Sequence, residues 1–77
     1  MSKLQLINAK TMEKVIMSLG FERTRQKGSH VFYRHSDGRT TTIPFHPSKD
    51  LARSLIREII NEINISVEEY NSILKNL

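Results

Sequence analysis

Residues 21–45 read FERTRQKGSHVFYRHSDGRTTTIPF, and this stretch decides the fold. Three strand-like runs alternate here with two turn signals; the runs are 21–26, 29–35 and 39–45, and the turns are Lys27-Gly28 and Ser36-Asp37-Gly38. Asp-Gly is a strong hairpin signal because glycine supplies the positive φ that such turns require. The stretch predicts a three-stranded antiparallel meander. Its third strand should end at Pro44 or run along a sheet edge, because proline cannot donate to a ladder.

Helical periodicity flanks this stretch on both sides. A first helix is predicted to begin near Asn8 and to stop at Gly20; its apolar face is Met12, Val15, Ile16 and Leu19. A main helix is predicted after His46-Pro47 and should end at Asn64; its apolar stripe is Leu51, Leu55, Ile56, Ile59, Ile60 and Ile63. A short last helix should follow Ser66, which matches a capping box by accepting from the amide of Glu69.

The fold class is therefore α+β: a helix, a three-stranded antiparallel sheet, a helix and a short C-terminal helix. We expect the helices to cover one face of the sheet and to leave the other face free. A chain of 77 residues is expected to form a single domain over 1–77. Without cysteine, its stability should come from packing alone.

Charge predicts a polyanionic partner. The formal net charge is +4, and the cations gather between Arg23 and Arg39, whereas the carboxyl-terminal part is acidic. Residues 1–6 carry neither the apolar run nor the cleavage site of a signal peptide, and no segment approaches membrane-spanning length. We expect a cytoplasmic protein with no membrane contact.

Lys27-Gly28-Ser29-His30 is the candidate site of chemistry. An imidazole can accept or donate a proton near neutral pH, and the neighbouring lysine would attract a phosphate. This is minimal equipment for cutting RNA, whose 2′-hydroxyl is an internal nucleophile. The alternative is a surface histidine at the start of a strand. Strand alternation places His30, Phe32 and Arg34 on one face, but it does not say which face is open.

Several cations could form a groove that neutralises phosphates; they are Arg23, Arg25, Lys27, Arg34, Arg39 and Lys49. By strand alternation, Arg23 and Arg25 should share a face. Lys49 should lie at the mouth of the main helix, whose free amides would add to its attraction for phosphate. The alternative is an ordinary solvated surface.

Other kinds of site find little support in the sequence. Ser29 is expected to bind RNA and Ser54 to form hydrogen bonds. Neither is expected to act as a nucleophile, since no carboxylate is placed to orient a histidine near either. The three histidines lack Cys, Asp or Glu partners at ligand spacing, so we predict neither a metal site nor any other cofactor.

Taken in order, several short motifs resemble the HicA toxin family, small ribonucleases of bacterial type II toxin-antitoxin pairs. The motifs are Gly20-Phe21, Gln26-Lys27-Gly28-Ser29-His30, Tyr33-Arg34-His35 with Asp37-Gly38, Ile43-Pro44-Phe45-His46, Lys49 with Leu51, and Ile65-Ser66-Val67-Glu68-Glu69-Tyr70. The resemblance implies a fold like the double-stranded RNA-binding domain, a catalytic role for His30 and metal-independent cutting of messenger RNA. It also implies a HicB antitoxin that covers the active region. Many members carry Gly-Thr or Gly-Leu where this chain has Ser54-Leu55, which puts the start of the main helix in doubt.

These observations favour an endoribonuclease in which Lys27, Arg25 and Lys49 hold phosphates around His30. A second proton-transfer group could be water, His35 or His46. Two other hypotheses stay open. One is a non-catalytic RNA-binding module that reads duplex shape through the minor groove. The other is a subunit whose basic face is covered by an acidic protein partner.

Overall fold

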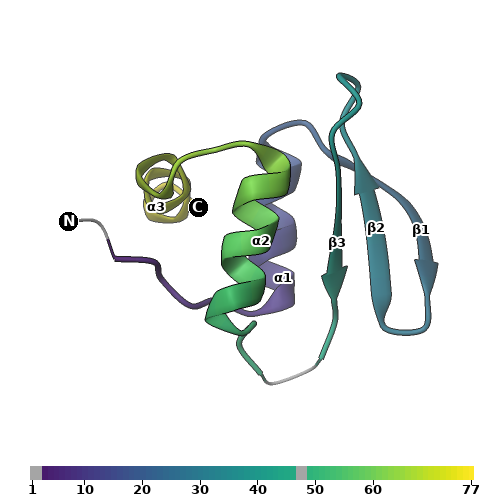
Figure 1. The fold of residues 1–77 in the computed structure, drawn as a ribbon, viewed down its shortest axis with the longest axis horizontal. Coiled ribbons are helices and arrows are strands. Elements are labelled where there is room, and N and C mark those ends of the chain that lie inside the picture. Colours follow the sequence, from purple (N-terminus) through teal and green to yellow (C-terminus); the bar gives the residue numbers. More distant parts are fainter. Residues whose placement is uncertain (1–2, 47–48) are drawn as a thin grey trace.

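The computed structural model of the protein describes residues 3–46 and 49–77. The elements follow one another in the predicted order; they are α1 (Ala9–Ser18), β1 (Glu22–Lys27), β2 (His30–Arg34), β3 (Thr40–Pro44), α2 (Arg53–Ile63) and α3 (Val67–Lys75) (Figure 1). The strands form one antiparallel sheet in the order β1-β2-β3. This confirms the predicted α+β class and the meander. β3 ends at Pro44 and is an edge strand, as its proline predicted.

The ends of α1 follow from its flanking residues. The Asn8 side chain caps the first turn by accepting from the amide of Thr11 at 2.9 Å. Gly20 has a φ of 99°, and the amides of Gly20 and Phe21 donate to the carbonyls of Met17 and Ile16. This pattern closes the helix with a left-handed residue, the role that its position predicted for the glycine.

The start of α2 differs from the prediction. Leu51 is buried with the core but lies before the helix, which begins at Arg53 and has Ala52 as its N-cap without a side-chain bond. Ser54 therefore lies inside the first turn and does not cap the helix. The other end agrees with the sequence, since Asn64 closes α2 with a φ of 59°. Ser66 caps α3 by accepting from the amide of Glu69.

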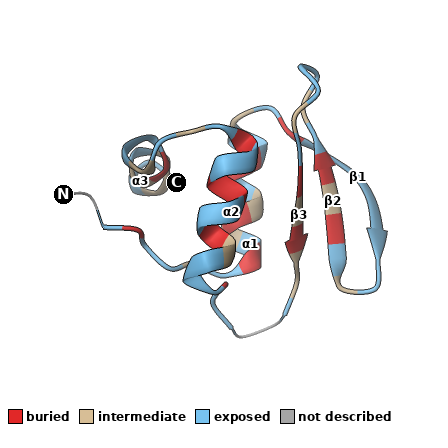
Figure 2. Cartoon of the chain, in the orientation of Figure 1, coloured by how far each residue is buried: buried red, intermediate tan, exposed pale blue. Residues whose placement is uncertain are grey.

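The sheet has one covered face and one open face. Val31, Tyr33 and Ile43 are on the covered face and are almost wholly buried in a single apolar core. Figure 2 shows buried positions along β2 and β3 and exposed ones along β1. α2 packs beside β3, and α1 lies behind α2 in the view of Figure 1. His30 and Arg34 alternate with the buried residues of β2 and are exposed. We call the surface that carries His30, Phe32 and Arg34 the open face.

Tight turns join the strands. Gly28 and Ser29 form the two-residue connection between β1 and β2, with a φ of 59° at Gly28. The turn makes Lys27 and His30 direct partners across the strand pair. Gly38, with a φ of 101°, closes the connection from β2 to β3. Within the described residues, no helix is long and apolar enough to cross a bilayer.

Candidate catalytic histidine and nucleic-acid interface

His30 is exposed at the first position of β2. Its partner Lys27 is the last residue of β1, and directly opposed residues of antiparallel strands point to the same face. The Cβ atoms of such directly opposed residues lie about 5 Å apart. The hairpin therefore brings an imidazole and an ammonium group together on the open face. Ser29 lies half-buried in the turn between them.

A β-bulge at Thr24 overturns the predicted placement of Arg23. Arg23 pairs with Tyr33 and Arg25 pairs with Phe32, so Thr24 is the extra residue of β1. Tyr33 points to the helices and Phe32 to the open face. Consequently Arg23 and Arg25 point to opposite faces, although strand alternation predicted that they share one.

Arg23 belongs to a polar cluster between α1 and the sheet. Glu13 accepts hydrogen bonds from the guanidinium of Arg23 and from the hydroxyl of Tyr33. Burial alone would raise the pKa of Glu13, but the bonds from Tyr33 and Arg23 outweigh it and hold that pKa below its ordinary value. Burial, together with the bond to Glu13, raises the pKa of Tyr33. The cluster thus ties Arg23 to the helix side of β1.

Arg39 is also committed to the fold. Its guanidinium bonds to Asp37 and to the carbonyl of Ile63, and it lies 5.1 Å from the centre of the Phe21 ring. The predicted groove of six cations therefore loses Arg23 and Arg39 to internal contacts.

The open face keeps three of the predicted cations. Arg25 and Lys27 reach it from β1, and Arg34 lies at the far end of β2 from His30. Arg34 is four positions along β2 from His30, a distance of about 13 Å. Lys49 is exposed in the connection before α2, three residues ahead of the N-cap, so it precedes the helix end instead of lying on it.

His30 also borders a groove that the sequence did not reveal. The groove has a volume of about 300 Å³ and lies between β3 and α2. Besides His30, it is lined by Thr42 and Pro44 of β3 and by Leu55, Glu58 and Glu62 of α2. Two carboxylates of α2 therefore share a groove with His30. Glu62 accepts a hydrogen bond of 2.7 Å from Thr41, and both glutamates are exposed. The surroundings of His30 are cationic on the β1 side and acidic on the α2 side.

The other two histidines differ in their availability. His35 uses both ring nitrogens, because Nε2 donates to the Leu19 carbonyl at 3.1 Å and Nδ1 accepts from the amide of Asp37 at 3.1 Å. It is half-buried beyond the end of β2 opposite to His30. His46 is exposed two residues after Pro44, which pairs with His30. Pro47, the next residue, lies outside the described part of the chain.

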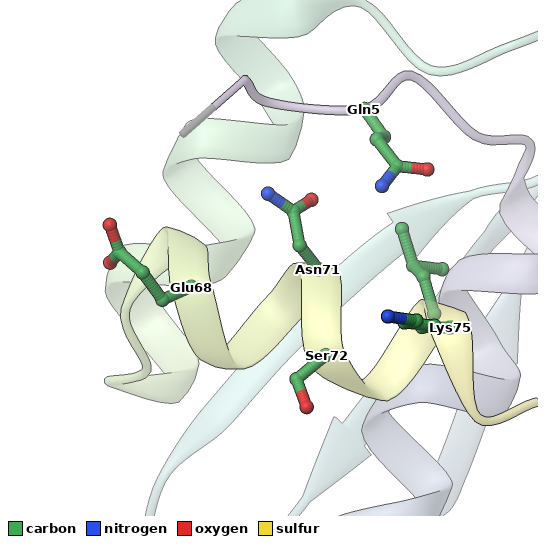
Figure 3. Close-up of a pocket in the computed structure, with 6 residues that line it drawn as sticks. Gln5, Glu68, Asn71, Ser72 and Lys75 are labelled. Carbon is green, nitrogen blue, oxygen red and sulfur yellow. The ribbon is translucent and has the colours of Figure 1, made fainter. Parts of the chain in front are cut away.

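A second depression, of about 600 Å³, lies between α3 and the segment before α1 (Figure 3). Gln5, Asn71 and Lys75 line it, and the Asn71 amide donates to the carbonyl of Lys3 at 2.8 Å. The Tyr70 hydroxyl bonds nearby to the Gln5 carbonyl, and burial raises the pKa of Tyr70 to about 12. α3 and the sheet lie at opposite ends of the molecule (Figure 1), so this depression is remote from His30.

Metal-ligating side chains do not gather in the part of the chain that the structure describes: no group of three or more His, Asp or Glu is placed to share an ion. Independence of metals stays a prediction from the sequence.

Comparison with protein families adds independent information. A family model described as the HicA toxin of bacterial toxin-antitoxin systems matches residues 9–65. The chain belongs to the HicA toxin family. The match runs from α1 through the sheet and α2 to the residue before the Ser66 cap, so it contains His30 and the whole open face. No curated protein matches the chain.

Proposed function

We propose that this member of the HicA toxin family is a metal-independent endoribonuclease that cuts messenger RNA, with His30 as its proton-transfer group. The observation that carries the proposal is the pairing of His30 with Lys27 on an exposed face of the sheet. An imidazole next to an ammonium group can move a proton beside a bound phosphate. The family membership supports a toxin, and RNA is the nucleic acid that brings its own nucleophile.

The chemistry follows from this geometry. His30 takes the proton from a 2′-hydroxyl, and the freed oxygen attacks the adjacent phosphorus. The bond from phosphorus to the 5′-oxygen breaks, and that oxygen takes up a proton. The products are a 2′,3′-cyclic phosphate and a 5′-hydroxyl. Lys27 and Arg25 lie on the side of His30 where the phosphate oxygens can be held, since the α2 side carries Glu58 and Glu62.

A second proton donor is needed for the leaving oxygen. His35 does not fit this role because both of its ring nitrogens are engaged. Water, His46 and Glu58 are compatible with the structure. The two side chains are exposed, so Glu58→Gln and His46→Ala should fold. If either side chain supplies the proton, its variant loses rate without losing RNA affinity.

The direct test measures cleavage of a labelled single-stranded RNA by the purified chain. His30→Ala should lower the rate by about 10²- to 10⁴-fold, because proton transfer by one side chain is worth that much. Lys27→Ala should also lower it, whereas Lys14→Ala, which removes an exposed cation from α1, should not. Equal rates for wild type and His30→Ala would refute the catalytic role.

The open basic face also suits the runner-up, an RNA-binding module without activity. That function would be supported if the wild-type chain bound RNA and left it whole. Both functions require the same cations, so only cleavage separates them.

Inhibition by a HicB-like antitoxin completes the proposal. The antitoxin would cover the end of the open face around Lys27 and His30, or pair with the free edge of β1, whose six residues are all exposed. Expression of the chain alone should arrest growth, and co-expression of the antitoxin should restore it. An interface mapped to α3 instead would contradict this placement.

A further inference from the structure

We infer that Phe32 and Arg25 form a stacking site for one unpaired base of the RNA, directly beside His30 on the open face. This inference rests on the proposed function and names the form of substrate that the site takes, which is single-stranded RNA.

Phe32 differs from the other large apolar side chains of the sheet. It is half-buried, yet it belongs neither to the core nor to the side chains packed against the core. The guanidinium of Arg25 lies over the ring, 4.6 Å from its centre. The fold therefore gains no core packing from an aromatic ring at this position, and the ring faces solvent under a cation.

A depression of about 360 Å³ surrounds the ring. It is lined by Thr24, Arg25, Phe32, Tyr33, Arg34, Thr40, Thr41 and Thr42. Thr40 and Thr42 face Arg34 and Phe32 across the strand pair, so hydroxyl groups border the ring on the β3 side. This combination provides an aromatic surface, two flanking cations and hydroxyls that both donate and accept hydrogen bonds.

The position of Phe32 relative to His30 fits neighbouring nucleotides. The two residues are separated by one position on the same strand and share a face, so their Cβ atoms lie about 6.6 Å apart. The carboxylates of Glu58 and Glu62 lie on the far side of His30 and repel phosphates. An RNA strand held at His30 is thereby directed over β1 and β2, across Phe32.

Stacking selects for unpaired bases. An aromatic ring accepts any base on its π-face, and an arginine on the same site adds a cation–π contribution. A base inside a duplex is stacked on both sides and cannot reach a ring on a sheet. The site therefore favours single strands and discriminates weakly among the four bases.

The test uses the full chain with His30→Ala, which keeps the RNA intact. A short single-stranded RNA carrying 2-aminopurine reports stacking by fluorescence quenching and affinity by anisotropy. Adding Phe32→Ala should weaken binding by about 5- to 150-fold and remove the quenching. Phe32→Tyr should preserve both. Met17→Ala, which truncates an exposed apolar side chain on α1, should change neither.

Two results would overturn the stacking site. One is that Phe32→Ala leaves RNA affinity and quenching unchanged. If Phe32→Ala weakened only the binding of a protein partner, that result would count in the same way. The other is an equal loss of affinity for duplex RNA. Failure of the proposed nuclease looks different: the wild-type chain would leave RNA whole while binding still depended on Phe32. Conversely, normal cleavage with an unchanged KM in Phe32→Ala would refute the stacking site and keep the nuclease.

Discussion

Replacing Arg25 or Arg23 with alanine tests the bulge at Thr24, because the bulge gives these neighbouring cations different partners. Arg25 lies on the open face with Lys27 and Arg34, whereas Arg23 is bound to Glu13 on the helix side. Arg25→Ala should weaken RNA binding and make the RNA affinity less dependent on salt. Arg23→Ala should leave the salt dependence unchanged.

The magnitude follows from the number of phosphates neutralised. Each contact with a single strand contributes about 0.7 to the slope of log affinity against log salt, so three open-face cations give a slope near −2. Raising the salt from about 50 to about 200 mM should then weaken binding roughly 20-fold for the parent and roughly 7-fold for Arg25→Ala. Arg25→Ala should also lose affinity at every salt concentration, since its contact with Phe32 is lost.

Anisotropy titrations in the His30→Ala background measure these slopes. Circular dichroism at the assay temperature verifies that each variant is folded, which matters for Arg23 because it pairs with Glu13. If Arg23→Ala lowered the slope as much as Arg25→Ala, both cations would face the RNA, and the account of β1 would be wrong.

The remaining predictions concern the stability that holds this face in place. Tyr33→Phe removes a hydrogen bond to the ionised Glu13 and should cost about 1.5 kcal/mol, or a fall in Tm of about 6–12 °C at neutral pH. The pKa of Glu13 in the folded chain lies below its ordinary value near 4.5, so the parent should lose this contribution as the pH falls through the folded-state pKa. The Tm values of parent and variant should therefore converge in acid. A Tm difference that stayed constant with pH would contradict the bond between Tyr33 and ionised Glu13. Gly20→Ala should destabilise the fold more than Gly38→Ala. Both positions have positive φ, but an added Cβ at Gly20 would lie 3.0 Å from the ring of His35, and at Gly38 it would meet nothing within 4 Å. Equal unfolding midpoints would show that this contact costs nothing.

Much of the fold could be predicted because its signals are local. The residues at the helix ends act through bonds to their own turns; they are Asn8, Gly20, Asn64 and Ser66. The alternation in β2 correctly groups His30, Phe32 and Arg34 on one face, but only the structure shows that this face is the open one. The start of α2 was harder to predict, because Leu51 continues the apolar stripe although it lies two residues before the helix begins. It is buried by tertiary packing, which periodicity cannot distinguish from helical burial.

The site was less predictable for two physical reasons. β1 is polar and exposed throughout, so nothing in its sequence records which side chain faces which way, and the bulge at Thr24 left no signal. Glu58 and Glu62 approach His30 only because α2 packs beside β3. The spacing of four residues between Glu58 and Glu62 places them on one face of the helix. That spacing does not reveal which strand the face would pack against.

The termini of the cleaved RNA test the central claim most directly. Digestion of a defined single-stranded RNA by the wild-type chain, followed by mass spectrometry of the fragments, identifies the groups at both new ends. Attack by the neighbouring ribose oxygen with His30 as proton acceptor predicts a 2′,3′-cyclic phosphate and a 5′-hydroxyl, and both ends should form about 10²- to 10⁴-fold more slowly with His30→Ala. A 5′-phosphate would show that water is the nucleophile and would contradict the mechanism.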